Sequence, residues 1–241
     1  MIRLLSQNRH LLYPICLPII SFGIWATNTY PLPHRVLFPI YFGQTEISEN
    51  IFIDDPSRTD VLNLVQLSEE RITPFFGDIH SNPRYVICTT SICDEIFGVR
   101  FSGSATPGFG ILISSKGLNE AIFVHERVHA ELHERIGTVR LPIWFNEGVA
   151  VYLSSREHKR PEVLDDAIEN VKELILPMSW TALHFGHPDG LALTYTPAYA
   201  AILDLVDEIG RTGLRDVIAR MEKGETLDAA LAAIRAGSDQ S

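Results

Sequence analysis

The sequence predicts an α+β fold in which a small twisted sheet with a covering helix comes first and a lobe of helices follows. Three short runs of β-forming residues, 50–53, 84–90 and 110–114, lie in the first half of the chain and are bounded by turn residues. Beyond residue 118, apolar residues recur at helical spacing to the end of the chain. We expect a cleft between the sheet-containing part and the helical part.

The sequence also predicts the structure of the connections between these strands. Residues 58–76 carry apolar side chains at helical spacing, and Pro74 with Gly77 marks the end of this covering helix. Residues 97–110 are rich in glycine, so we expect a mobile or tightly turned loop there.

Two helices follow the last strand. The first covers 118–135 and stops at Gly137, and the second covers 142–155 with Pro142 in its first turn. The second helix is apolar nearly all round, so it should be buried. The remaining expected elements are helices at 161–174, 194–209, 214–221 and 227–234, with an irregular segment at 180–190.

The composition sets limits on size and partners. A chain of 241 residues, 46% of them hydrophobic, can form one large domain or two small lobes. Its net charge of -10 argues against nucleic acid as a partner, which requires a basic surface. Cys88 and Cys93 can form a disulfide across a short loop or remain as buried thiols, and neither has partners at the spacing of a structural zinc site.

The N-terminal segment predicts a membrane location. No acidic residue precedes Glu46, and Leu11 to Ala26 is predominantly apolar after Arg3 and Arg9. We interpret residues 1–34 as an uncleaved membrane anchor and linker that leaves residues 35–241 outside the cytoplasm. A cleaved signal, which would make the protein secreted or periplasmic, and a buried core segment remain as alternatives. The expected domain then divides into a sheet-containing lobe, 35–137, and a helical lobe, 138–241, with the proline-rich stretch 31–39 as the linker before it.

His125, Glu126 and His129 predict a metal site on the helix at 118–135. Residues four apart on a helix lie on one face, roughly 6 Å apart at Cβ, which suits two imidazoles on one ion. Glu126 then lies beside the ion, where its carboxylate can accept a proton from a metal-bound water. His133 extends the row by another turn, but it lies about 12 Å along the axis from His125 and cannot share its ion. The alternative interpretation is a solvated helix face without metal.

Glu147 is the best candidate for a third ligand. A catalytic zinc usually takes three protein ligands and leaves the fourth position to water. Glu147 lies in the apolar helix at 142–155, where a carboxylate is rarely buried unless it is paired or binds metal. Asn146, next to it, can orient a ligand through a hydrogen bond, or can make a cap or backbone contact instead.

His125-Glu126-x-x-His129 followed by Asn146-Glu147-Gly148-x-Ala150 resembles the gluzincin metallopeptidases, most closely the peptidase MA-like group. The resemblance implies a zincin-like fold, a zinc ion held by His125, His129 and Glu147, and Glu126 as the catalytic base. Two departures stand out. The chain lacks the G-x-M-E-N motif of aminopeptidase-N-like enzymes, and Val151 replaces the Asp that supports a histidine in thermolysin-like enzymes.

The resemblance also assigns roles outside the metal site. It implies that the strand at 110–114 is the edge strand that pairs with the substrate backbone, although an ordinary core strand fits the same sequence. It further implies that a Tyr or His of the later lobe donates a hydrogen bond to the oxyanion. Tyr195 is the first candidate, before Tyr199 and then His184 or His187; both tyrosines can instead be core aromatics.

The predicted function is zinc-dependent hydrolysis of peptide bonds in a peptide or protein substrate outside the cytoplasm. One alternative is a membrane-anchored gluzincin-like interaction protein, whose zinc is structural or whose activity is restricted to one partner. The other is a helical protein without metal. The sequence does not indicate the substrate or the oligomeric state.

Overall fold

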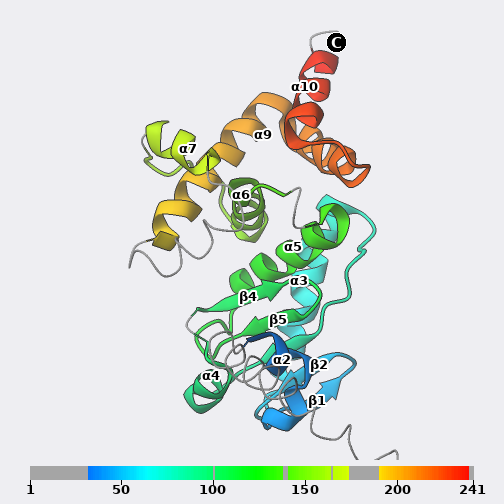
Figure 1. The fold of residues 1–241 in the computed structure, drawn as a ribbon, viewed down its shortest axis with the longest axis vertical. Coiled ribbons are helices and arrows are strands. Elements are labelled where there is room, and N and C mark those ends of the chain that lie inside the picture. Colours follow the sequence, from blue (N-terminus) through cyan, green and yellow to red (C-terminus); the bar gives the residue numbers. More distant parts are fainter. Residues whose placement is uncertain (1–31, 100, 138–140, 164, 174–189, 239–241) are drawn as a thin grey trace, which may run out of the picture.

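The computed structural model describes residues 32–99, 101–137, 141–163, 165–173 and 190–238. The predicted α+β class is confirmed: a small mixed sheet is combined with helices on both of its faces and with a helical C-terminal part (Figure 1). The predicted strands at 50–53, 84–90 and 110–114 are present. The five strands, in chain order, are β1 Thr45–Ser48, β2 Ile51–Ile53, β3 Tyr85–Ile87, β4 Gly103–Thr106 and β5 Gly110–Ile113.

The sheet has the order β1-β2-β3-β5-β4. The three inner strands, β2, β3 and β5, are parallel, and each outer strand is antiparallel to its neighbour. The expectation that 110–114 forms the edge strand is therefore wrong, because β5 is paired on both sides. The edge strand next to β5 is β4, which lies inside the stretch that we expected to be a loop, and β1 forms the opposite edge.

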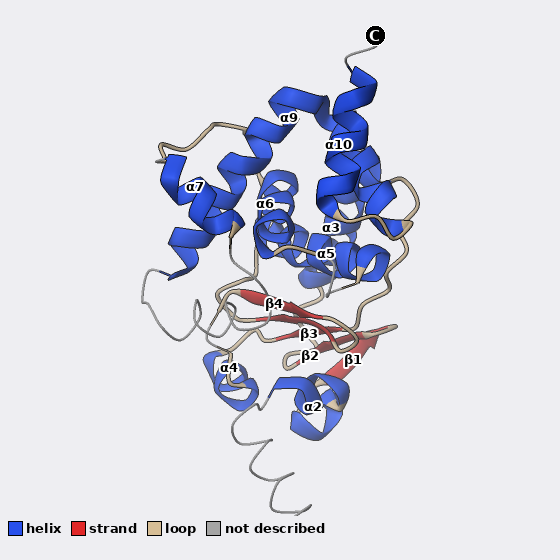
Figure 2. Cartoon of the chain, turned by 45° about the horizontal axis from the view of Figure 1, so that its top comes forward, coloured by secondary structure: helices blue, strands red, loops and turns tan. Residues whose placement is uncertain are grey.

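Helices cover both faces of the sheet (Figure 2). One face carries α3 Asp60–Phe76 and α5 Glu120–Ile136, and the other carries α2 Leu32–Leu37, the 3-10 helix η1 Pro39–Phe42 and α4 Ser91–Phe97. Side chains alternate between the faces: Ile51 and Ile53 pack with Phe123 of α5, whereas Phe52 packs with Val36 of α2. The predicted linker at 31–39 is thus partly wrong, because α2 packs against the sheet through the buried Val36.

Cys88 and Cys93 form a disulfide, which answers the question that the sequence left open. The bond connects the end of β3 to α4, a helix that we did not predict. Thr90 caps this helix by accepting a hydrogen bond from the backbone N–H of Cys93. The disulfide holds α4 against the end of β3, and the cap stabilises the first turn of the helix.

The helical part consists of α6 Ile143–Ser154, α7 Asp165–Lys172, α9 Gly190–Glu222 and α10 Leu227–Ser238. The long α9 is two helices joined at Gly210, whose positive φ of 73° interrupts the helix at the predicted stop. Gly148 of α6 lies against α9, since a Cβ atom there would come within 2.4 Å of the Ala198 carbonyl oxygen. This close approach explains the glycine that follows Glu147.

The expected anchor at residues 1–34 lies almost entirely outside the described residues. Among the helices of the described part, none is both long enough and apolar enough to cross a membrane. The anchor therefore stays a prediction from the sequence.

Three charged residues of α5 bind the segment that leads into β3. Glu131 is fully buried and accepts hydrogen bonds from the backbone N–H groups of His80 and Ser81 at 3.0 Å each. Arg127 donates to the carbonyl oxygen of Ser81 at 2.7 Å, and Arg135 donates to Glu131 at 2.6 Å and to the carbonyl oxygen of Asp78. These contacts fix α5 relative to the sheet.

The charge on Glu131 should therefore stabilise the fold. Burial would raise the pKa of Glu131, but hydrogen bonds from His80, Ser81 and Arg135 lower it overall below the ordinary 4.5. A carboxylate with a lowered folded-state pKa contributes stability above its unfolded-state pKa and loses it as the pH falls through the folded-state value. We expect the free energy of unfolding to decrease below pH 4.5 partly for this reason.

Glu131→Gln is expected to lower the free energy of unfolding at neutral pH by about 3 kcal/mol, because it removes the fully buried carboxylate that neutralises the buried Arg127 and leaves Arg135 with Glu222 alone. It should also show a weaker loss of stability in acid. Both are measured by urea unfolding with a chelator present throughout. Glu134→Gln, an exposed carboxylate on the same helix, is the control. Equal stability and equal acid dependence of the two variants would contradict the role of Glu131.

Candidate metal centre

His125 and His129 lie on one face of α5 and direct their Nε2 atoms to one point. The two Nε2 atoms are 3.0 Å apart, and the rings meet edge to face with centroids 4.6 Å apart. Asn119 caps helix α5 by accepting a hydrogen bond from the backbone N–H of Ile122, so the helix is established about one and a half turns before His125. The predicted pair of imidazoles is therefore held on a well-formed helix.

Glu147 reaches the same point from α6. Its Oε2 atom lies 3.4 Å from Nε2 of His125 and 3.3 Å from Nε2 of His129. Ligands bound about 2.0–2.1 Å from a tetrahedral zinc are about 3.3 Å from one another, so the spacing matches a shared ion. Moreover, Oε2 is buried and has no hydrogen-bond donor in good geometry among the described residues. His125, His129 and Glu147 thus form a group that can bind a metal ion.

Asn146 supports His129 from the neighbouring position on α6. Its Oδ1 lies 2.9 Å from Nδ1 of His129, and the ring nitrogen donates in the tautomer that leaves Nε2 free for a ligand role. The side chain therefore contacts a candidate ligand and does not cap the helix. Val151 cannot provide this support, so Asn146 supplies it from another position of the same helix.

The charges in the site depend on one another. Burial would raise the pKa of Glu147, but His129 and His125 lower it overall. Burial would lower the pKa of His129, but Glu147 raises it to about 9. Without a cation, the carboxylate is therefore compensated by a proton on the imidazole. A metal ion can replace that proton, which is the usual relation between metal binding and protonation.

Glu126 points toward the edge strand β4. Burial raises the pKa of its carboxylate, against the effects of the two histidines and of a hydrogen bond from the backbone N–H of Ala105. A Cβ atom on Gly103 would come within 2.7 Å of Cγ of Glu126. Because Gly103 has no side chain, β4 leaves room at this position for the side chain of Glu126. Sequence reasoning missed this residue, although its place in a run of small residues was a signal.

The four oxyanion candidates fall into three groups. Tyr195 lies against the site, with its ring 5.6 Å from that of His125 and edge-on to it. Burial, Glu147 and Glu126 raise the pKa of Tyr195, so its hydroxyl keeps its proton. Tyr199 belongs to the apolar core and donates to the carbonyl oxygen of Glu157 at 3.4 Å, as its core interpretation predicts. His184 and His187 lie outside the described residues.

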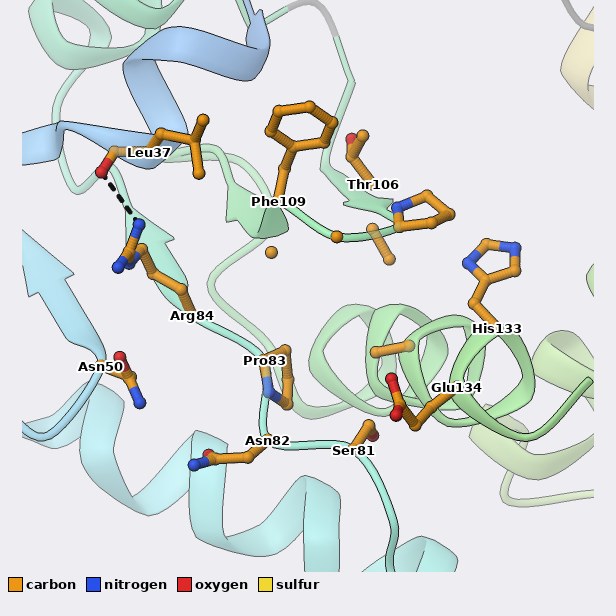
Figure 3. Close-up of a pocket in the computed structure, with 15 residues that line it drawn as sticks. Leu37, Asn50, Ser81, Asn82, Pro83, Arg84, Thr106, Phe109, His133 and Glu134 are labelled. Atoms are coloured by element: carbon orange, nitrogen blue, oxygen red, sulfur yellow. Dashed lines mark hydrogen bonds between the residues drawn. The ribbon is translucent and has the colours of Figure 1, made fainter. Parts of the chain in front are cut away.

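A pocket of about 360 Å³ opens beside the site, between α5 and the turn that joins β4 to β5 (Figure 3). His133 and Glu134 border it on the α5 side, and Thr106 and Phe109 border it on the opposite side. The ring of His133 stacks on that of His129 with centroids 6.2 Å apart, but His133 is not part of the ligand group. On α5 the pocket is bordered by Ala130, His133 and Glu134, so it lies directly beside the candidate metal ligands without including them.

Comparison of the chain with protein-family models, with curated proteins and with solved structures finds no match. The resemblance to gluzincins therefore stays a prediction from the two sequence motifs.

Metal content provides the direct test of this centre. The full chain, purified after expression with zinc, should contain about one zinc per chain by elemental analysis, and Glu147→Gln and His129→Ala should contain little, because each removes one of three protein ligands. His133→Ala is the matched control on the same helix and should keep the metal. Absence of zinc in the parent after reconstitution, or loss of zinc in the control alone, would contradict the assignment.

Proposed function

We propose that the protein is a zinc-dependent hydrolase of peptide bonds. The observation that carries this proposal is the convergence of His125, His129 and Glu147 on one point, with the carboxylate of Glu126 beside them. Two imidazoles and one carboxylate are the ligand set of a catalytic zinc, which keeps one position for water. A structural site would normally use four protein ligands, and the described residues supply three within reach.

The residues of the chain would share the chemistry as follows. Zinc, when bound, polarises the substrate carbonyl and makes a water molecule more acidic. Glu126 takes a proton from the attacking water and later delivers it to the leaving amine; its raised pKa favours this exchange near neutral pH. Tyr195, which keeps its proton, donates a hydrogen bond to the developing oxyanion.

The edge strand β4 gives an extended substrate a place beside these groups. β4 pairs with β5 on one side only, so its other edge offers backbone groups to a peptide that adds to the sheet. Gly103 and Ala105 of β4 contact Glu126, and Ala105 and Thr106 border the pocket. A peptide along β4 would place one side chain in this pocket and the bond to be cleaved near Glu126. The predicted N-terminal anchor would place this activity at a membrane outside the cytoplasm.

Glu126→Gln separates catalysis from metal binding. We expect the variant to retain about one zinc per chain but to lose roughly 100-fold or more in the rate of hydrolysis, because the amide cannot accept the proton. Cleavage is measured on a library of internally quenched fluorescent peptides.

Glu70→Gln, an exposed carboxylate on α3 away from the pocket, is the matched control and should retain turnover. Undiminished hydrolysis by Glu126→Gln would remove the proposed base. A parent protein that binds zinc but cleaves no peptide of the library would favour the alternative of a structural or partner-restricted zinc site.

Tyr195→Phe tests the oxyanion donor. It should lower kcat by about 10²–10³ with little change in zinc content, since one hydroxyl that acts in the transition state is removed. Tyr199→Phe, one turn further on α9, should lose much less kcat because its hydroxyl bonds to a backbone carbonyl. If both variants lose kcat equally, or neither does, Tyr195 has no specific role.

A further inference from the structure

The large apolar side chains that remain exposed are gathered on one side of the molecule. Among the described residues, six of the seven exposed large hydrophobic residues lie on the segment from α2 to η1 or on α4. These six residues, named here the outer apolar face, are Leu37, Phe38, Ile40, Tyr41, Ile92 and Ile96. The seventh, Leu67, lies on α3. Such clustering marks an interaction surface, whereas single exposed apolar residues do not.

The two segments that carry the outer apolar face are joined to each other. Arg35 donates a hydrogen bond to the carbonyl oxygen of Ile96, and the rings of Phe42 and Phe97 meet edge to face with centroids 6.0 Å apart. The disulfide between Cys88 and Cys93 attaches α4 to the sheet. The exposed side chains are therefore presented by one packed layer, on the face of the sheet opposite to α5 (Figure 2).

The sequence just before this layer is the longest uncharged stretch of the chain. The predominantly apolar segment 11–26 is separated from the first residue of α2 by residues 27–31 alone. Five residues span at most about 18 Å when fully extended. The surface or membrane that binds segment 11–26 must therefore lie close to the outer apolar face.

We propose that the outer apolar face rests on the surface of a lipid bilayer, beside the point where segment 11–26 enters it. Phe38 and Tyr41, with 56% and 86% of their surfaces exposed, suit the headgroup region, where aromatic side chains are enriched at membrane proteins. Ile40 and Ile92, 63% and 69% exposed, add aliphatic area beside them. The inference rests on the proposed anchoring, and it orients the catalytic helix α5 away from the membrane, toward the aqueous phase.

Tryptophan quenching by lipid tests this proposal on the full chain. Tyr41→Trp and Ile92→Trp each place an indole on the outer apolar face, and Leu67→Trp is the matched control at an exposed apolar position elsewhere. Each variant and the parent are incorporated into vesicles of phosphatidylcholine or of brominated phosphatidylcholine, and flotation establishes that they are bound. The parent signal is subtracted from each variant.

We expect brominated lipid to reduce the added emission of Tyr41→Trp and Ile92→Trp by roughly half, because interfacial indoles lie near the upper acyl chains. The added emission of Leu67→Trp should not change. A chain that floats with all three indoles unquenched would overturn the inference and leave the anchor standing; iodide access would then show whether water or protein covers the face. A chain that does not float would overturn both the anchor and the inference, whereas zinc content and peptide cleavage would still decide the proposed hydrolysis.

Discussion

Helix α5 is packed on two sides, and this double packing positions everything else. Phe123 joins the core between the helix and the sheet, whereas Val124, Val128 and Leu132 join the core of the helical part. The histidines lie at the boundary between these two cores. Arg127, Glu131 and Arg135 occupy the side that faces the segment leading into β3, and their hydrogen bonds oppose any rotation of the helix. A helix fixed in this way can hold two imidazoles at a constant separation, which a metal site requires.

The packing of α6 against α9 has a matching role for the third ligand. Gly148 lets α9 approach so closely that the Ala198 carbonyl lies where a side chain would otherwise be, and this contact brings Tyr195, one turn before Ala198, beside His125. Asn146 and Glu147 then meet α5 from the other side of α6. The four positions of the second motif thus have physical reasons: a support for His129, a ligand, a close helix contact and a small buried residue. A buried carboxylate such as that of Glu147 is costly unless a metal ion or a protonated histidine compensates it.

Features that depend on the periodicity of one segment could be predicted from the sequence. Features that depend on which distant segments pack or pair with each other could not. The spacing of His125 and His129 is a property of one helix, and the apolar surroundings of Glu147 are visible in its own segment, so the ligand group could be predicted. The edge strand could not, because only Thr106 of Gly103, Ser104, Ala105 and Thr106 favours strands, and β4 becomes a strand by pairing with β5. Likewise, α2 lies within a proline-rich stretch whose composition is typical of a linker. Its packing through Val36 is a tertiary contact, which the composition of the stretch does not indicate. The role of Gly103 beside Glu126 depends on the same unpredicted pairing.

The two faces of the sheet separate two kinds of contact. On the α5 face, buried charges and imidazoles require compensation from ions or hydrogen bonds, so that face favours a small, polar and specific ligand site. On the α2 and α4 face, the exposed groups are apolar and lie within a short span of an uncharged segment of the chain. A hydrolase held at a membrane by the second face would present the first face, with β4 as its free edge, to extended segments in the aqueous phase. The same inner strands support both faces, because alternate side chains of β2, β3 and β5 point in opposite directions.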